Sequence, residues 1–156
     1  MTDAQDTQVS QPTAYELLGG EAGVRRLVER FYAVMDREPA LEVIRRMHPP
    51  MLDRSIDNLF WFLSGWLGGP PIYVEKRGHP MLRARHLPFS IGEAERDQWV
   101  ACMIVAMEEE GVEENLRKSL TEAFYKTADW MRNQAGSPAE QMLAKLDAES
   151  KGQGKT

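Results

Sequence analysis

Apolar residues recur every three or four positions along most of this 156-residue chain. That spacing gathers them on one face of an α-helix, whereas a half-buried β-strand would alternate apolar and polar residues. No segment of the sequence alternates in that way. Six segments follow the helical spacing, at 15–18, 24–35, 41–47, 52–67, 99–107 and 116–131. The sequence therefore predicts an all-α fold.

Residues with special backbone preferences separate these helices. Thr13 is an N-cap candidate for the first helix, and Gly19 and Gly20 tolerate the left-handed backbone that ends it. Pro39 suits the first turn of the third helix. Glycines and prolines at 68–71 stop the fourth helix, and the segment 72–85 keeps no sustained period. We expect a long loop with one short turn there, and loops of that length usually serve a site.

Length and composition fit a single domain. With 42% hydrophobic residues the chain can bury one core, and it is too short for two comfortable domains. The helical pattern predicts a structured domain over residues 13–135. Residues 1–12 are expected to form a flexible N-terminal extension. Residues 136–156 are expected to form a polar, flexible tail, in which one loose helix over 138–149 stays open.

Charge and terminal composition exclude several classes of partner. The formal net charge of -5 argues against nucleic acid, because nucleic-acid binders usually carry an excess of Lys and Arg. The N-terminus lacks the pattern of a secretory signal, and no stretch reaches the roughly 18 apolar residues of a membrane span. We therefore expect a cytoplasmic protein with no membrane partner. The single cysteine, Cys102, lies in an apolar helical pattern and is expected to be an inert core residue.

The candidates for metal binding are three histidines, His48, His79 and His86. None is spaced from another histidine or from a glutamate as a helical zinc site requires, so a multi-histidine centre is poorly supported. A lone histidine in a loop is usually an ordinary hydrogen-bonding residue. On spacing alone, His86 would be a weak candidate for a ligand, and its neighbours change that expectation.

The sequence around His86 carries a family resemblance. The segment RHLPF at 85–89 is followed by an acidic stretch and Trp99, and it resembles the proximal segment of truncated haemoglobins of the second group. Further similar motifs are Phe31-Tyr32, His48-Pro49, Phe62-Leu63 and Arg77-Gly78-His79-Pro80. Together they cover about residues 13–135. The resemblance implies a truncated globin, in which two helices pack over two others as a helical sandwich around haem.

The resemblance implies that His86 is the axial ligand of the haem iron. The chain has no CxxCH attachment motif, so the cofactor expected is haem b held without a covalent bond. Pro88 restricts Leu87 and helps to present His86, whose second ring nitrogen should donate to a backbone carbonyl. Arg85 and Tyr73 are the candidates for binding the haem carboxylates, and Lys76 and Arg77 could substitute for them. Cofactor contacts are also expected from Phe89, Phe62 and Leu63.

Polar residues on the opposite side of the haem are expected to meet the ligand. In the family, the positions of Tyr32 and Trp99 line the ligand face of the iron, and each side chain offers a hydrogen-bond donor. The alternative is an ordinary core Tyr and Trp whose polar atoms meet backbone carbonyls. Other residues expected in this distal pocket are Phe31, His48, Ser55 and Leu59.

His48 departs from the family pattern, because Tyr or Phe is more frequent at its position. It could join Tyr32 and Trp99 as a third polar group, or bind ferric iron as a sixth ligand, and an exposed corner histidine is the alternative. His79 is expected to be structural. Ser55 is short, so we expect it to leave room for water or for ligand entry rather than reach the ligand.

The function expected is reversible binding of dioxygen, and of other small ligands such as NO, CO or peroxide. We expect an oxygen-binding and transport protein more than a dedicated enzyme, with peroxidase-like or NO dioxygenase side activity, and an unidentified reductase as partner. A homodimer stays open. The alternatives are a haem-based redox enzyme, and a haem-free helical interaction module whose loop at 68–85 docks a partner. A haem-based sensor would need an output module, and the short polar ends offer none.

Overall fold

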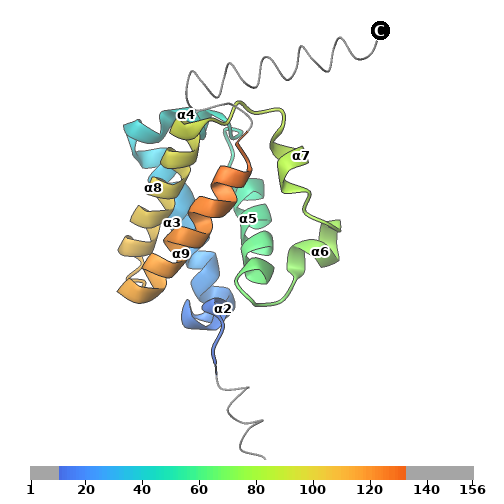
Figure 1. The fold of residues 1–156 in the computed structure, drawn as a ribbon, viewed down its shortest axis with the longest axis vertical. Coiled ribbons are helices and arrows are strands. Elements are labelled where there is room, and N and C mark those ends of the chain that lie inside the picture. The colour runs from blue at the N-terminus through green and yellow to red at the C-terminus, as the bar shows by residue number, and fades with distance from the viewer. Residues whose placement is uncertain (1–10, 133–156) are drawn as a thin grey trace, which may run out of the picture.

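A computed structural model describes residues 11–132, and all regular structure within this range is helical, as the sequence predicts (Figure 1). The expected tail at 136–156, with its open helix at 138–149, lies outside the described residues, as does most of the expected extension at 1–12. The helices are α2 (Ala14–Leu17), α3 (Gly20–Arg37), the 3-10 turn η1 (Pro39–Leu41), α4 (Glu42–Arg46), α5 (Asp53–Trp66), α6 (Ile72–Arg77), α7 (Leu82–His86), α8 (Glu93–Glu109) and α9 (Glu114–Trp130).

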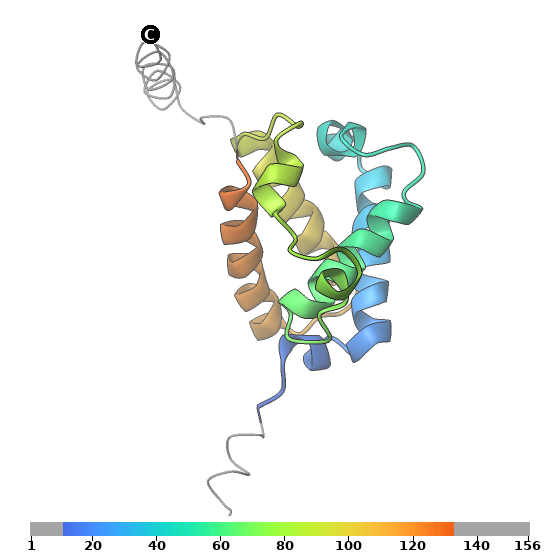
Figure 2. The same cartoon turned by 90° about the vertical axis from the view of Figure 1, so that its right-hand side faces the viewer.

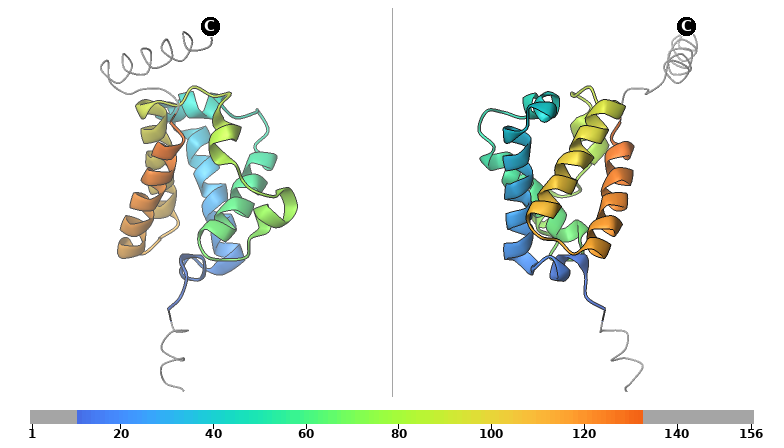
Figure 3. Two further views of the ribbon diagram at one scale, coloured as in Figure 1. Left: turned by 45° about the vertical axis from the view of Figure 1, so that its right-hand side comes forward. Right: turned by 90° about the vertical axis from the view of Figure 1, so that its left-hand side faces the viewer.

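Four long helices form two pairs. Helix α3 packs against α5 and α8, and α8 also packs against α9. Figure 2 shows α3 with α5 on one side of the molecule and α8 with α9 on the other, and the right-hand view of Figure 3 shows α8 and α9 side by side. This is the expected arrangement of two helices over two. The short helices α6 and α7 lie together on one side of the bundle.

The core forms where α3 meets α5 and α8. Helix α3 contributes a continuous buried face, because its apolar residues recur at helical spacing. Helix α8 supplies a matching set, which includes Cys102. The side chains that are almost fully buried are Phe31, Phe124, Leu27, Met35, Leu63, Met103, Met107, Val24, Val28, Val34, Cys102 and Ser64. No helix between residues 11 and 132 is both long and apolar enough to cross a bilayer.

The helix boundaries at the N-terminal end agree with the predicted caps. The Thr13 hydroxyl accepts a hydrogen bond from the Glu16 backbone at 3.1 Å, and the Glu16 carboxylate accepts one from the Thr13 backbone at 2.9 Å. This reciprocal pair satisfies two backbone donors that a helix start leaves without partners. Gly19 and Gly20 have φ angles of 104° and 69°, so both adopt the backbone predicted for them.

The prediction for 72–85 is wrong, because this segment forms two short helices instead of a long loop with one turn. Helix α6 has six residues and α7 has five, and neither is long enough to repeat an apolar position over two turns. Tyr73 is the residue that α6 buries. Hydrophobic periodicity therefore carries no signal for helices of this length.

The start of α3 is held close to the end of α2 by a glycine contact, which yields a prediction about stability. A Cβ atom at Gly23 would overlap the Leu18 carbonyl oxygen, so Gly23→Ala must move backbone apart. We expect it to destabilise the fold by about 1–3 kcal/mol, despite the better helix propensity of Ala. Chemical denaturation followed by circular dichroism measures this loss.

The matched control is Ala33→Ser on the exposed side of the same helix. We expect a change of about 0.5 kcal/mol or less, as for most exposed substitutions. Equal stability of Gly23→Ala and the unmodified protein would mean that α2 does not pack against α3 as described.

Candidate functional site

His86 ends α7 and has a fixed ring orientation. Its Nδ1 donates a hydrogen bond to the Leu82 carbonyl oxygen at 2.6 Å, one helical turn earlier. A neutral imidazole that donates from Nδ1 carries its lone pair on Nε2. The backbone carbonyl partner expected from the sequence is therefore present, and it selects the tautomer in which Nε2 can bind a metal.

His48 lies against Tyr32 and within electrostatic reach of His86. Its ring makes an edge-to-face contact with Tyr32 at a centroid distance of 5.5 Å, and its Nδ1 donates to the Ile44 carbonyl at 2.8 Å. Burial lowers the pKa of His48, and positive charge on Arg45 or His86 lowers it further, while the Ile44 hydrogen bond opposes them. His48 is half-buried, so it is not the exposed corner residue of the alternative interpretation.

Tyr32 and Trp99 belong to a connected set of aromatic rings. Phe31 contacts both of them, at centroid distances of 5.0 Å to Tyr32 and 5.2 Å to Trp99. Trp99 then contacts Phe124 at 5.6 Å, and Phe124 stacks on Trp66 at 4.8 Å. Because these rings come from α3, α8, α9 and α5, they lock the four long helices around one aromatic interior.

The polar atoms of Tyr32 and Trp99 are donors without protein partners. Within residues 11–132 neither the Tyr32 hydroxyl nor the Trp99 Nε1 donates a hydrogen bond to another group. Tyr32 is only 6% exposed, and this burial raises its pKa above the ordinary value, with a smaller contribution from Cys102. The hydroxyl therefore stays protonated. The backbone carbonyl partners of the alternative interpretation are not found in the described residues.

Helix α5 presents a second apolar face beside its packed one. Phe60, Leu63 and Ser64 are buried, and the Ser64 hydroxyl donates to the Phe60 carbonyl at 2.8 Å. The predicted site residues Ser55, Leu59 and Phe62 are only half-buried. Because Ser55, Leu59 and Phe62 are spaced by four and three residues, they share one face of α5. That face points in a different direction from the face of Phe60, Leu63 and Ser64. This face is available to line a site between α5 and the helices opposite.

A pocket of about 440 Å³ opens beside this face of α5. Leu82, whose carbonyl orients His86, is one of its lining residues. The pocket thus adjoins the helix that carries the candidate ligand. Its lining comes from α5, from α9 and from the turn that leads into α7: Phe62, Trp66, His79, Pro80, Met81, Leu82, Lys126, Thr127 and Trp130.

The candidates for the haem carboxylates lie together, while their proposed substitutes do not. The Arg85 guanidinium is 5.7 Å from the centre of the Tyr73 ring, and its Nε donates to the Pro80 carbonyl at 2.7 Å. Tyr73 also meets Phe62, at a centroid distance of 6.5 Å. Lys76 and Arg77 instead lie over the ring of Trp61.

Phe89 and His79 lie in the turns on either side of α7. Phe89 is 38% exposed in the turn after α7. His79 accepts a hydrogen bond at Nδ1 from the Met81 backbone at 3.1 Å, which agrees with a structural role in the turn before α7.

Sequence reasoning missed three features of this region. The first is that the Leu82 carbonyl is the partner of His86. A prediction of a helix over 82–86 would have indicated this residue, because it lies four positions before His86. The stacking of Phe124 on Trp66 has no sequence signal, because both residues fit an ordinary apolar stripe. The side-chain oxygens of Asn58 and Gln98 are buried without partners within the described residues, and nothing in the sequence marks them.

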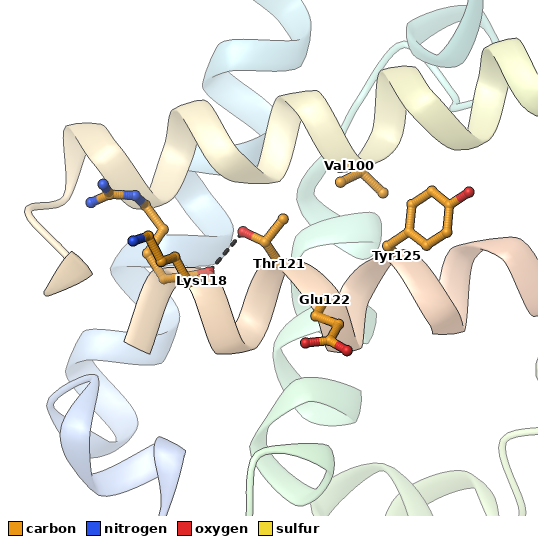
Figure 4. Close-up of a pocket in the computed structure, with 6 residues that line it drawn as sticks. Val100, Lys118, Thr121, Glu122 and Tyr125 are labelled. Carbon is orange, nitrogen blue, oxygen red and sulfur yellow. Dashed lines mark hydrogen bonds between the residues drawn. The ribbon is translucent and has the colours of Figure 1, made fainter. Parts of the chain in front are cut away.

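A second hollow, between α8 and α9, is a poor candidate for the site (Figure 4). Val100 and Tyr125 give it apolar walls, and Lys118 and Glu122 lie at its rim. The hydroxyl of Thr121 donates to the Arg117 carbonyl at 2.7 Å, so it is not directed at a ligand. None of the site residues predicted from the sequence lines this hollow.

The residues around His86, Tyr32 and Trp99 suit a metal ion that already carries most of its ligands. Within residues 11–132 no group of three or more His, Cys, Asp or Glu side chains could hold a metal ion. An iron porphyrin needs only one protein ligand, because the macrocycle supplies four nitrogens. One oriented imidazole, two donors without protein partners and apolar walls fit such a group.

A two-over-two helical fold with one such imidazole defines a shortened globin. The chain matches the family of bacterial-like globins over residues 13–133, and it belongs to that family. Its similarity to group II truncated hemoglobins places it among them. The family implies a haem cofactor and a small gaseous ligand such as dioxygen.

Both sequence and structure support this assignment. The chain is 42% identical over 120 residues to the group 2 truncated hemoglobin YjbI of Bacillus subtilis, which covers 77% of this chain and 88% of that protein. The cold-adapted truncated hemoglobin of Pseudoalteromonas haloplanktis is 46% identical with a TM-score of 0.76, over 79% of this chain and 99% of that one. The group II 2-on-2 hemoglobin of Agrobacterium tumefaciens is 45% identical with a TM-score of 0.76, over 80% and 97%.

Cys102 is a thiol that the site leaves unused, and its burial yields a prediction about reactivity. Its Sγ donates to the Phe31 carbonyl at 3.2 Å, and burial raises the pKa of the thiol to about 12. Since the thiolate is the reactive form, we expect Ellman's reagent at pH 8 to label Cys102 only when the protein unfolds. Labelling rates measured across a urea series check this.

The control is the unfolded protein in concentrated urea, where Cys102 should react at once. Rapid labelling of the native protein would contradict the burial of this side chain.

Proposed function

We propose that this protein binds haem b through Nε2 of His86 and binds dioxygen reversibly on the opposite face of the haem. One observation carries the proposal: the His86 ring is fixed by the Leu82 carbonyl, while Tyr32 and Trp99 keep donors without protein partners. Attachment is non-covalent, since the single Cys102 forms no CxxCH motif.

The surrounding residues fit a porphyrin in polarity. Leu59 and Phe62 offer apolar contact for the macrocycle, whose burial they would stabilise in proportion to the area removed from water, while Leu63 supports them from the packed core. Arg85 and Tyr73 offer a cation and a hydroxyl for its carboxylates, and they already lie side by side. Phe89 could turn inward from its partly exposed position to complete the contact.

A haem held by His86 would supply a ferrous iron able to bind dioxygen. Dioxygen draws electron density as it binds, so O–H and N–H groups aimed at it stabilise the bound state. The Tyr32 hydroxyl and the Trp99 indole are the groups we assign to this task. Each hydrogen bond would contribute about 1 kcal/mol. The neighbouring aromatic rings would limit the access of water, which would otherwise compete for these two donors.

The remaining distal residues have supporting roles in this proposal. His48 packs on Tyr32 and holds it by an edge-to-face contact, and its lowered pKa keeps it neutral near pH 7. Phe31 separates Tyr32 from Trp99 and fixes the angle between them. Ser55 is too short to compete with the two donors and leaves space on α5.

A solved relative gives support from outside this chain. The haemoglobin of Bacillus subtilis whose X-ray structure is described as oxygen-avid is 39% identical to this chain, with a TM-score of 0.71. It covers 78% of this chain and 100% of its own. Strong retention of dioxygen is what two donors on the ligand would produce here.

The first test of the function is loss of the proposed iron ligand. We expect His86→Ala to abolish stoichiometric haem binding or to change the spectrum of the complex, because no second imidazole can take its place on α7. Titration of the purified protein with haemin, followed by its Soret band, measures this.

His79→Ala is the matched control, since this histidine lies at the edge of the pocket in the turn before α7 and accepts a backbone hydrogen bond at Nδ1, as expected of a structural residue. It should bind one haem with the spectrum of the unmodified protein. An unchanged complex in His86→Ala would overturn the ligand assignment, and no Soret band in any variant would favour a haem-free interaction module.

The second test concerns the two donors. We expect Tyr32→Phe or Trp99→Phe to raise the dissociation rate of dioxygen about tenfold, the effect of losing roughly 1.4 kcal/mol. Stopped-flow displacement of dioxygen from the ferrous protein measures the rate.

The controls remove the same groups elsewhere. Tyr125→Phe deletes a hydroxyl from an exposed position on α9, and Trp61→Phe deletes the half-buried indole over which Lys76 lies. Both should dissociate dioxygen at the original rate. If the Tyr32 and Trp99 variants do so as well, the donor assignment is wrong.

A further inference from the structure

The segment that carries His86 has an unusual charge for this chain. Residues 72–92 contain four of the 19 Lys and Arg residues but only one of the 24 Asp and Glu residues, Glu75. The protein as a whole has a formal net charge of -5. Positive charge is therefore concentrated on one short stretch of an otherwise acidic protein.

The structure leaves cations of this stretch without counter-charges. Lys76 and Arg77 on α6 and Arg85 on α7 form no ion pair within residues 11–132. Several arginines on other helices do, as in the bridge from Arg37 to Glu109 at 2.7 Å, which joins α3 to α8. The positive charge of Lys76 and Arg77 is thus available to a partner.

Aromatic rings hold these cations in place of carboxylates. The Lys76 ammonium lies 5.0 Å and the Arg77 guanidinium 5.5 Å from the centre of the Trp61 ring. A cation over an aromatic face is attracted to it by roughly 0.5–1 kcal/mol at an exposed site, and it keeps its full charge. The arrangement orders the side chains and preserves their ability to attract an anion.

Exposed apolar side chains accompany the cations. Val74 on α6 is 52% exposed, Met81 in the turn before α7 is 56% exposed, and Leu87 after α7 is 66% exposed. Apolar contacts with charged groups around them are typical of protein interfaces. We call these three residues together with Lys76 and Arg77 the α6–α7 surface, and Figures 1 and 2 show both helices on the same side of the bundle.

We propose that the α6–α7 surface docks a small acidic electron-carrier protein that reduces the haem iron. The inference rests on the proposed function, because ferric iron must gain an electron before dioxygen can bind again. One electron leaves the carrier, which is oxidised, and the ferric iron is reduced to ferrous. A carrier seated on α6 and α7 lies against the helix whose last residue is His86.

Charge distribution favours a compact protein over a membrane or a nucleic acid. A lipid surface or a duplex extends well beyond the α6–α7 surface and would meet the carboxylates of the remaining chain. A small carrier would interact only with the α6–α7 surface, because charges more than about 8 Å away are largely screened at physiological salt. Electron-transfer complexes are also among the smaller protein interfaces, of about 1,200 Å² or less.

The test uses the haem-loaded protein and a purified flavodoxin of strongly negative net charge as the probe. Stopped-flow absorbance measures the second-order rate at which reduced flavodoxin reduces the ferric protein, over a series of salt concentrations. We expect the rate to fall steeply with salt, because attraction between opposite charges accelerates the encounter. We expect Lys76→Glu/Arg77→Glu to lower the rate at least tenfold at low salt and to remove most of the salt dependence.

The matched control reverses the same number of charges elsewhere. Arg46→Glu/Lys118→Glu changes one Arg and one Lys whose side chains are 70% and 71% exposed, on α4 and α9. The formal charge is the same in both double variants. The control should lower the rate by less than twofold, so that position and not net charge explains the difference.

Binding is measured independently of electron transfer by isothermal titration of the oxidised flavodoxin. We expect a complex that the Lys76 and Arg77 variant loses and the control keeps. Equal rates in the two double variants, no complex with the unmodified protein, or Lys76- and Arg77-dependent binding to phosphatidylserine vesicles in place of flavodoxin would each overturn the proposal.

Failure of this inference can be told from failure of the proposed function. Haem uptake and the oxygenated spectrum are recorded for each variant, and neither depends on flavodoxin. A protein that takes up haem and dioxygen but shows no flavodoxin complex refutes the docking surface alone.

Discussion

The hydrogen bond from Nδ1 of His86 to the Leu82 carbonyl is the contact on which the rest of the site depends. An imidazole can present either nitrogen to a metal, and only a second partner decides which one. Here the partner belongs to the same five-residue helix, so α7 needs no other element to set the tautomer. Because the bond is local, it depends on the helical conformation of α7 and not on how α7 packs against the long helices.

The Tyr32 hydroxyl and the Trp99 indole are donors that lack protein partners within residues 11–132, while Phe31 packs against both rings and Phe124 against Trp99. A donor left without a partner in largely apolar surroundings costs free energy. Such a cost is common at sites where a ligand completes the hydrogen bonding. The raised pKa of Tyr32 has the same origin, since burial disfavours the phenolate and keeps the donor protonated.

The long helices could be predicted from the sequence because each buries a continuous face, as Val24, Leu27 and Phe31 do in α3. The helices α6 and α7 could not, since six and five residues are too few to show a period. His86 was identifiable from its motif, whereas its partner Leu82 depends on a helix that the pattern does not reveal. Contacts such as Arg85 over Tyr73 or Lys76 over Trp61 join residues on different turns or helices, so they follow from tertiary packing and have no local signal.

The short helices α6 and α7, which show no hydrophobic period in the sequence, can serve both the cofactor and a partner protein. Helices α6 and α7 bury little beyond Tyr73, and they are therefore held by few apolar contacts. Elements of this kind open and shift at lower free energy than the core does. We assign Tyr73 and His86 to the cofactor, while Lys76 and Arg77 remain without carboxylate partners within residues 11–132. A segment built mainly for packing would pair or bury its charges, as Arg96 does with Asp129 at 2.8 Å between α8 and α9. Lys76 and Arg77 lie instead over the ring of Trp61, which orders both side chains and leaves their charge accessible.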